Sequence, residues 1–190
     1  MKLRTMALAA ACALLSVPVF AQTPSQNTLP QNKQPQFNQQ QTTGVARANA
    51  AMSAPDFINK IVMGDMWDVR AARLAEQKGD RSDKTFGQTE ITSHTKLTDD
   101  LKAMVDSGQV KATIPTGWDN KHQQRLDQLS KMSGKQFDEA YNRDETQNHQ
   151  DMVNWLQQYA QNGDNPDLKQ WASKTLPEVT QHLTNADKLK

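Results

Sequence analysis

Apolar residues recur along residues 53–190 at the three- and four-residue spacings of helices, and no stretch alternates in the manner of a strand. Residues typical of helix starts and stops divide this part of the chain into segments. The pattern predicts helices from Ser53 to Lys78, from Ser82 to Ser107, from Asn120 to Lys131, from Ser133 to Asn162, and from Pro166 to the C-terminal end. Four long amphipathic helices joined by short loops indicate an all-α fold, an antiparallel four-helix bundle with one additional short helix.

Polar residues interrupt the apolar stripes of these helices at a regular offset. On three helices a glutamate is followed four residues later by a histidine, although the chain has only five glutamates and four histidines. Residues four apart share a helix face, so both members of each pair are expected to point towards the interior. The pairs are Glu90 and His94, Glu145 and His149, and Glu178 and His182, and Asp68 continues the stripe of the first helix.

Two interpretations of these pairs remain open. In the first, each glutamate accepts a hydrogen bond from its histidine or from the next helix, and the resulting polar layer fixes how the helices align. In the second, the same side chains hold iron, manganese or zinc at a mononuclear or dinuclear site between helices. The candidate ligands are Glu90, His94, Glu145, His149, Glu178 and His182, with Asp68 as a weaker candidate.

The positions of the last two pairs along the axes of their helices are predicted by counting residues from the turn at Gly163 that joins these helices. His149 lies 14 residues before Gly163 and His182 lies 19 residues after it, a difference of about 7 Å at the rise of an α-helix. Glu178 lies 15 residues after the turn and is almost level with His149. Thr175 to Glu178 also matches a capping box, which leaves open an alternative in which the helix breaks and restarts there, with Glu178 in a local capping role. This counting favours a staggered polar layer over a compact cluster.

The beginning of the chain has the pattern of an export signal. Lys2 and Arg4 precede an apolar run that ends in small residues at Ala21. The sequence therefore predicts a signal peptide over residues 1–21, cleaved after Ala21, and a periplasmic or secreted protein. Cys12 has no lipobox before it, so a lipid anchor is not expected there.

The composition of the following segment differs from that of the helices. Residues 22–52 are rich in Gln, Asn and Pro and contain few large apolar residues. Such a segment cannot bury enough surface to offset its chain entropy, so we expect a disordered tether. The helical domain is then predicted to cover residues 53–190, without a transmembrane segment.

Charge and motifs exclude several function classes. Lys and Arg number 22 and Asp and Glu number 21, without a basic face, so nucleic-acid binding is not expected. No phosphate-binding glycine loop, nucleophile elbow or catalytic triad occurs. The fourth histidine, His122, lies near the start of the short helix, where packing or capping is expected. We therefore expect a protein that binds something rather than transforms it, and the sequence names no partner or oligomeric state.

Motifs along most of the domain resemble those of a bacterial family, termed domain of unknown function 4142, of secreted helical proteins placed among ferritin-like bundles. The resemblance covers about residues 55–189 and rests on His94-Thr95-Lys96, His122-Gln123, Ser133-Gly134, Phe137-Asp138, Tyr141, His149, Thr175-Leu176-Pro177 and His182-Leu183. It implies a ferritin-like fold but no established activity. The chain departs from the family pattern at Arg70, Ser93 and Asn148, where the family tends to have acidic residues.

These observations together predict an envelope protein of the all-α class. The sequence favours a binding or structural module with a buried Glu/His polar layer. The alternative is a ferritin-like metalloprotein that binds iron, manganese or zinc between its helices.

Overall fold

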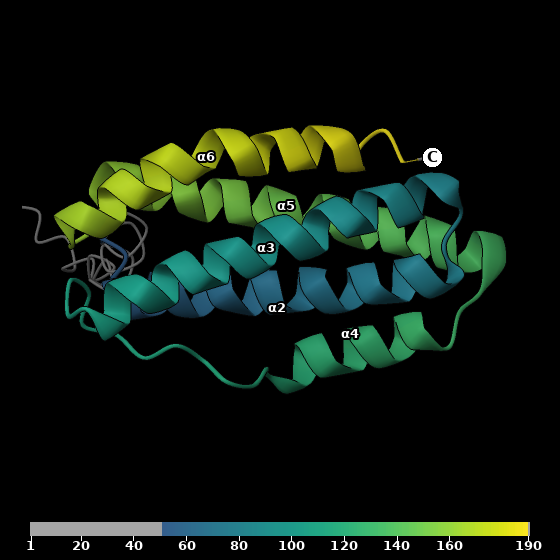
Figure 1. The fold of residues 1–190 in the computed structure, drawn as a ribbon, viewed down its shortest axis with the longest axis horizontal. Helices are drawn as coiled ribbons and strands as arrows, with labels where there is room; N and C mark the ends of the chain where they lie inside the picture. The colour runs from purple at the N-terminus through teal and green to yellow at the C-terminus, as the bar shows by residue number, and fades with distance from the viewer. Residues whose placement is uncertain (1–50, 190) are drawn as a thin grey trace, which may run out of the picture. The chain divides into compact units, whose positions relative to one another are not determined.

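The computed structural model describes residues 51–189, where α-helices are the only regular elements (Figure 1). The predicted signal peptide and nearly all of the predicted tether lie outside the described residues. No strand occurs within residues 51–189, which confirms the all-α class. The five helices are α2 (Ala54–Lys78), α3 (Arg81–Asp106), α4 (Asn120–Ser130), α5 (Gly134–Asn162) and α6 (Pro166–Ala186).

Short polar side chains start most of the helices. The Ser53 hydroxyl accepts a hydrogen bond from the Asp56 backbone N–H at the start of α2, and Asn165 caps α6 in the same way. The predicted start of α3 at Ser82 is wrong, because Asp80 is the residue that accepts from the Asp83 N–H, at 2.9 Å. Ser133 precedes α5 as predicted, but its side chain makes no capping hydrogen bond.

The helix ends differ from the prediction mainly in α6. Gly108 follows the end of α3 with a φ of 78°, a conformation that glycine adopts without steric cost. The predicted continuous helix through Pro177 is confirmed, so the alternative of a break between Thr175 and Glu178 is wrong, but α6 ends at Ala186, before the predicted end. Thr175 is buried rather than exposed at a helix start.

The four long helices pack side by side. α2 and α3 run in opposite directions along their whole length, as do α5 and α6 (Figure 1). Contacts between α2 and α5 and between α3 and α6 join the two hairpins. α2 and α3 approach closely at Gly87, where an added Cβ would lie 3.0 Å from the Ala72 carbonyl oxygen. The short helix α4 lies outside this group, against α2 and α5.

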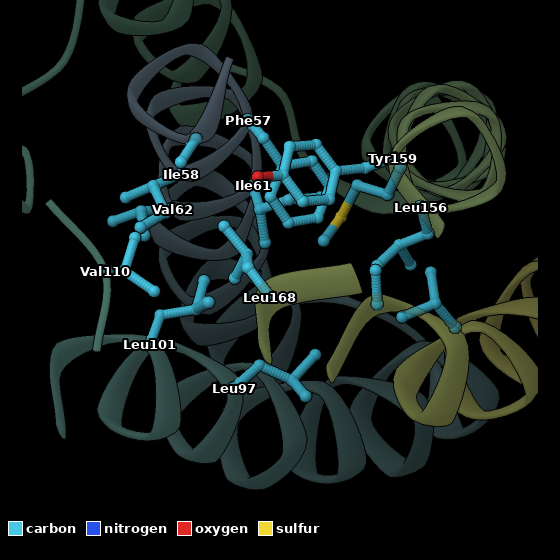
Figure 2. Packing of buried hydrophobic residues seen from close by; sticks show 14 of the residues in the cluster. Phe57, Ile58, Ile61, Val62, Leu97, Leu101, Val110, Leu156, Tyr159 and Leu168 are labelled. Carbon is cyan, nitrogen blue, oxygen red and sulfur yellow. The ribbon is translucent and has the colours of Figure 1, made fainter. Parts of the chain in front are cut away.

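The interior contains two apolar clusters. The first, shown in part in Figure 2, includes Phe57 and Ile61 of α2, Leu101 of α3, and Tyr159 of α5. The second includes Trp67 of α2, Phe137 and Tyr141 of α5, and the C-terminal end of the chain at Leu189.

A layer of polar residues separates the two clusters. Along α3 the chain passes from the second cluster at Phe86 through Glu90 and His94 to the first cluster at Leu97. α6 runs the other way, from the first cluster through His182 to the second at Ala186. The buried polar residues of neighbouring helices are therefore brought to one level by the apolar residues on either side.

None of the helices within residues 51–189 is both long enough and apolar enough to cross a bilayer.

A buried carboxyl group lies at the turn between α2 and α3. The side chain of Asp83 is fully buried, and neither of its oxygens accepts a hydrogen bond within the described residues. Burial, the negative charge of Asp80, and the hydrogen bond and negative charge of Asp138 raise the pKa of Asp83 to about 7. The folded protein therefore binds this proton more tightly than the unfolded chain does.

Replacing Asp83 by Asn is expected to stabilise the protein increasingly as the pH rises from 4 to 7. Well below the ordinary pKa of 3.8, both states of the wild type are protonated at Asp83, so the two proteins differ little. Above pH 7 the wild type contains a buried charge, and the variant is more stable by about 1–3 kcal/mol. Urea unfolding of both proteins between pH 4 and pH 8 measures the difference, and a difference that does not change with pH would contradict this account of Asp83.

Candidate metal centre

The polar layer brings seven titratable side chains together from four helices. At most 5% of each residue is exposed. The members are Asp65 and Asp68 of α2, Glu90 and His94 of α3, Glu145 and His149 of α5, and His182 of α6.

The Glu90 carboxylate lies at the centre of three imidazole rings. Its Oε2 atom is 2.9 Å from His94 Nε2 and 3.0 Å from His149 Nε2. His182 Nδ1 is 3.0 Å from each of the two carboxylate oxygens. The ring centroids of the three histidines are 5.3 to 5.7 Å apart. One carboxylate therefore faces a ring nitrogen from each of three histidines.

The orientation of two of these rings is fixed by bonds on their other nitrogen. His94 Nδ1 donates to Asp65 Oδ1 at 2.8 Å, and the second oxygen of Asp65 accepts from the Thr98 hydroxyl. His149 Nδ1 donates to the backbone carbonyl of Glu145 at 2.9 Å. In metal sites such bonds to the outer nitrogen set the tautomer and direct the inner nitrogen towards the ion.

This arrangement leaves electron pairs facing one another. With Nδ1 protonated, the Nε2 atom of a neutral His94 or His149 carries a lone pair and no proton. The two Nε2 atoms are 3.3 Å apart, and both face the negatively charged Glu90. Lone pairs at these separations repel one another in a buried site unless a positive charge lies among them. The centre therefore requires either added protons or a metal ion.

The pKa shifts follow from the same contacts. Burial raises the pKa of Glu90, but hydrogen bonds from His149, His182 and His94 outweigh it, so that the pKa lies well below its ordinary value. Burial lowers the pKa of His94, whereas the charge of Asp68 and hydrogen bonds to Asp65 and Glu90 raise it well above its usual range. A positive charge on His94, or beside Glu90, is therefore strongly favoured.

A second group of ligand atoms adjoins the first. Asp68, Glu145 and His149 each offer one atom, and these atoms lie within 4.8 Å of one another. Asp68 Oδ1 accepts a hydrogen bond from Asn148 at 2.8 Å. In the first group, one ligand atom each from Glu90, His94, His149 and His182 lies within the same limit.

One residue of the predicted set is not in the centre. Glu178 is exposed, because the buried face of α6 is formed by Thr175, Val179, His182 and Ala186, and Glu178 lies at its edge. The expected contact between Glu178 and His149 is therefore wrong.

The predicted stagger between His149 and His182 is wrong for a related reason. α5 ends at Asn162 and α6 begins at Pro166, so the turn is not centred on Gly163, and counting from Gly163 overestimates the offset between the two histidines. Helical side chains also lean towards the N-terminus of their own helix. On antiparallel helices His149 leans away from the turn and His182 leans towards it, and the two rings converge with centroids 5.7 Å apart.

Several neighbours of the centre were not selected as site residues from the sequence. Asp65 lies on the same apolar stripe as Asp68, and the i, i+3 spacing of the two is the signal that could have identified it. Asn148 stands where the family tends to have an acidic residue, and its amide donates to Asp68. Thr98 belongs to no motif or spacing that would identify it in the sequence, and only the tertiary structure shows its contact with Asp65.

His122, the remaining histidine, lies outside the centre. It is on α4, and its ring nitrogen Nδ1 donates to Asp119 at 2.8 Å. Asp119 also accepts from the His122 backbone N–H and so caps α4. The local role predicted for His122 agrees with these contacts.

Similarity to known proteins gives the family of the chain. Comparisons with curated proteins and with solved structures find no match. The family model described as "Domain of unknown function (DUF4142)" matches residues 39–189, a range that contains the whole polar layer. This chain therefore belongs to the DUF4142 family.

Proposed function

We propose that the protein binds a divalent transition-metal ion at Glu90, His94, His149 and His182. The observation that carries the proposal is the convergence of three histidine nitrogens on one buried carboxylate, with the outer nitrogens of two rings already bonded. A cation at this point removes the repulsion between lone pairs and neutralises Glu90. The sequence alone favoured a polar layer without metal, and the geometry of the three rings changes that preference.

The donor set limits the identity of the ion. Three imidazoles and one carboxylate suit zinc, iron or manganese, whereas calcium and magnesium favour sites made of oxygen ligands. Asp65 positions His94, and the Glu145 carbonyl positions His149. When bound, zinc supplies Lewis acidity, and iron or manganese adds the capacity to change oxidation state.

The fold proposed for the chain is a ferritin-like antiparallel four-helix bundle with α4 as an added helix. The two hairpins α2–α3 and α5–α6 and the polar layer between them support this arrangement. We also propose export to the periplasm or beyond the cell, which the Lys2, Arg4 and Ala21 pattern supports.

A second candidate function is a structural one, in which protons replace the ion. The separations of 2.9 to 3.0 Å between Glu90 and the histidine nitrogens favour this candidate, because they are hydrogen-bond distances. A protonated His94 would then satisfy Glu90, and the layer would fix the alignment of the four helices.

Metal content and thermal stability distinguish the two candidates. We expect protein purified without chelator to contain zinc, iron or manganese, and we expect its melting temperature to fall when EDTA removes the ion. In the His182→Ala variant the metal content and the chelator-dependent shift should both be lost, since one of four ligands is missing.

The control is His122→Ala, which removes a histidine from α4 and leaves the four ligands unchanged. This variant should bind metal as the wild type does. A wild-type protein that contains no metal after dialysis against zinc, iron(II) or manganese, and whose melting temperature does not respond to them, would support the proton-held layer instead.

A further inference from the structure

We propose that Asp68 and Glu145 hold a second divalent cation beside the one assigned to Glu90 and the three histidines. This inference rests on the proposed function, because it describes the number of ions in the same centre. Ligand atoms of Asp68, Glu145 and His149 lie within 4.8 Å of one another, so an ion between the two carboxylates is within reach of both.

The side chain of Glu145 is the main observation. Glu145 is fully buried, and neither of its carboxylate oxygens has a hydrogen-bond partner within residues 51–189. Asp68 Oδ2 is also buried without a hydrogen bond, because the nearest ring nitrogen, His94 Nδ1 at 3.4 Å, donates to Asp65. Buried carboxylates of folded proteins are normally paired, hydrogen-bonded or bound to a metal. The carboxylates of Glu145 and Asp68 are therefore available as ligands of a cation.

The charged groups around Glu145 do not supply this cation. From α2 and α3 it faces Asp68 and Glu90, and these negative charges together with burial raise the pKa of Glu145 well above its ordinary value. His149 Nδ1 lies 3.6 Å from Glu145 Oε2, but it donates to a backbone carbonyl instead. Further from the carboxylate, His94 bonds to Asp65 and Glu90.

The nearest basic side chain is also engaged elsewhere. Arg125 of α4 lowers the pKa of Glu145 by its charge, but its donors are directed to another residue. Its Nη2 atom donates to the Asp144 carbonyl at 2.6 Å, and its Nε atom lies 3.2 Å from the Asp144 carboxylate. The guanidinium also stacks over the Trp67 ring at 4.0 Å. Arg125 therefore does not complete the bonding of Glu145.

The charges of the whole centre match two ions. Four carboxylates are buried here, those of Asp65, Asp68, Glu90 and Glu145, whereas no Lys or Arg is among the buried residues of the described part. Neutral imidazoles carry no charge. When all four carboxylates are ionised, two divalent cations balance their charge, whereas one ion leaves a net charge of −2 that protons would have to neutralise.

The ligands of the two ions differ in kind. A histidine nitrogen has one lone pair, and His149 Nε2 faces Glu90, so the second ion depends mainly on carboxylate oxygens. Oxygen ligands favour a hard cation such as manganese(II) or iron(II). Glu90 is close enough to the second group for its charge to act on Glu145.

The number of bound ions tests the inference directly. We expect equilibrium dialysis against manganese(II), with zinc in parallel, to give two ions per wild-type chain and one per chain of Glu145→Gln. Glu139→Gln is the matched control, because Glu139 is an exposed glutamate of the same helix. Asp68→Asn should lose the same ion as Glu145→Gln and serves as the second variant if the first fails to fold.

Thermal stability gives an independent readout. In EDTA the Glu145→Gln variant should melt at or above the wild-type temperature, because the amide removes a buried charge that has no partner. On addition of manganese(II) the variant should gain less than the wild type. A role of Glu145 in packing alone predicts equal melting temperatures in EDTA and equal gains on addition of manganese(II), because Gln has nearly the shape of Glu, and equal gains would overturn the inference.

The outcomes also separate the two proposals. One ion per chain in both the wild type and Glu145→Gln would overturn the second site and leave the histidine site intact. No bound ion in the wild type would overturn both. In crystals grown with manganese(II), we expect two anomalous peaks in the wild type, and the peak between Asp68 and Glu145 should be absent from Glu145→Gln.

Discussion

Glu90→Ala is expected to destabilise the fold by about 3–5 kcal/mol even when no metal is present. The substitution removes the carboxylate that three histidine nitrogens face at 2.9 to 3.0 Å. It leaves the buried imidazoles of His94, His149 and His182 without the carboxylate that they face, and it opens a space at the centre of the helices. Urea unfolding of both proteins in EDTA measures the loss.

The control for Glu90→Ala is Glu178→Ala. Glu178 was predicted from the sequence to belong to the same set, but it is exposed at the edge of α6. Its removal should change the free energy of unfolding by less than about 0.5 kcal/mol. Equal losses in the free energy of unfolding for the two variants would show that the contacts of Glu90 with the histidines do not stabilise the fold.

Phe57→Ala is expected to cost about 3–5 kcal/mol without removing the metal centre. Phe57 is fully buried, and its ring stacks on Tyr159 with the centroids 4.2 Å apart. It also meets the edge of Trp171, so three helices lose contacts at once. Phe57 precedes Asp65 by eight residues on α2, about 12 Å along the helix. Denaturation curves measure the loss, and metal content should remain at the wild-type value.

Tyr159→Phe is the milder comparison for Phe57→Ala. This change keeps the stacked ring and removes the hydroxyl that donates to Asp164 at 2.8 Å. Asp164 also accepts from the Ala54 backbone N–H, so the hydroxyl supports the contact between the start of α2 and the turn before α6. A loss of about 1 kcal/mol is expected. If Phe57→Ala loses as little stability as Tyr159→Phe, the stacked ring of Phe57 does not stabilise the fold as proposed.

Most of the fold could be predicted from the sequence because the apolar period and the capping residues agree. The end of α2 at Lys78 and the start of α6 at Pro166 were both predicted. The cap of α3 was wrong by two residues, because Asp80 and Ser82 are both good capping residues and only the structure shows which one accepts the backbone hydrogen bond.

The candidate site was predicted less completely. Periodicity placed Glu90, His94, Glu145 and His149 in the interior, since each lies on the apolar stripe of its helix. It failed at Glu178, which lies about 80° from the centre of the buried stripe of α6 and is exposed. The level of His182 relative to His149 depended on the geometry of the turn and on the lean of the side chains, and counting residues includes neither.

The distribution of the ligands over the two hairpins has a mechanical consequence. Glu90 and His94 belong to the α2–α3 hairpin, whereas His149 and His182 belong to α5–α6, and 92 residues of sequence separate Glu90 from His182. An ion bound by all four is a cross-link between the hairpins, in a sequence whose single cysteine, Cys12, excludes a disulfide within the chain. A disulfide responds to the redox potential of its surroundings. The strength of this cross-link is set instead by the free concentration of the ion, so chelation would weaken the attachment of the two hairpins and leave it to their apolar contacts and the polar layer.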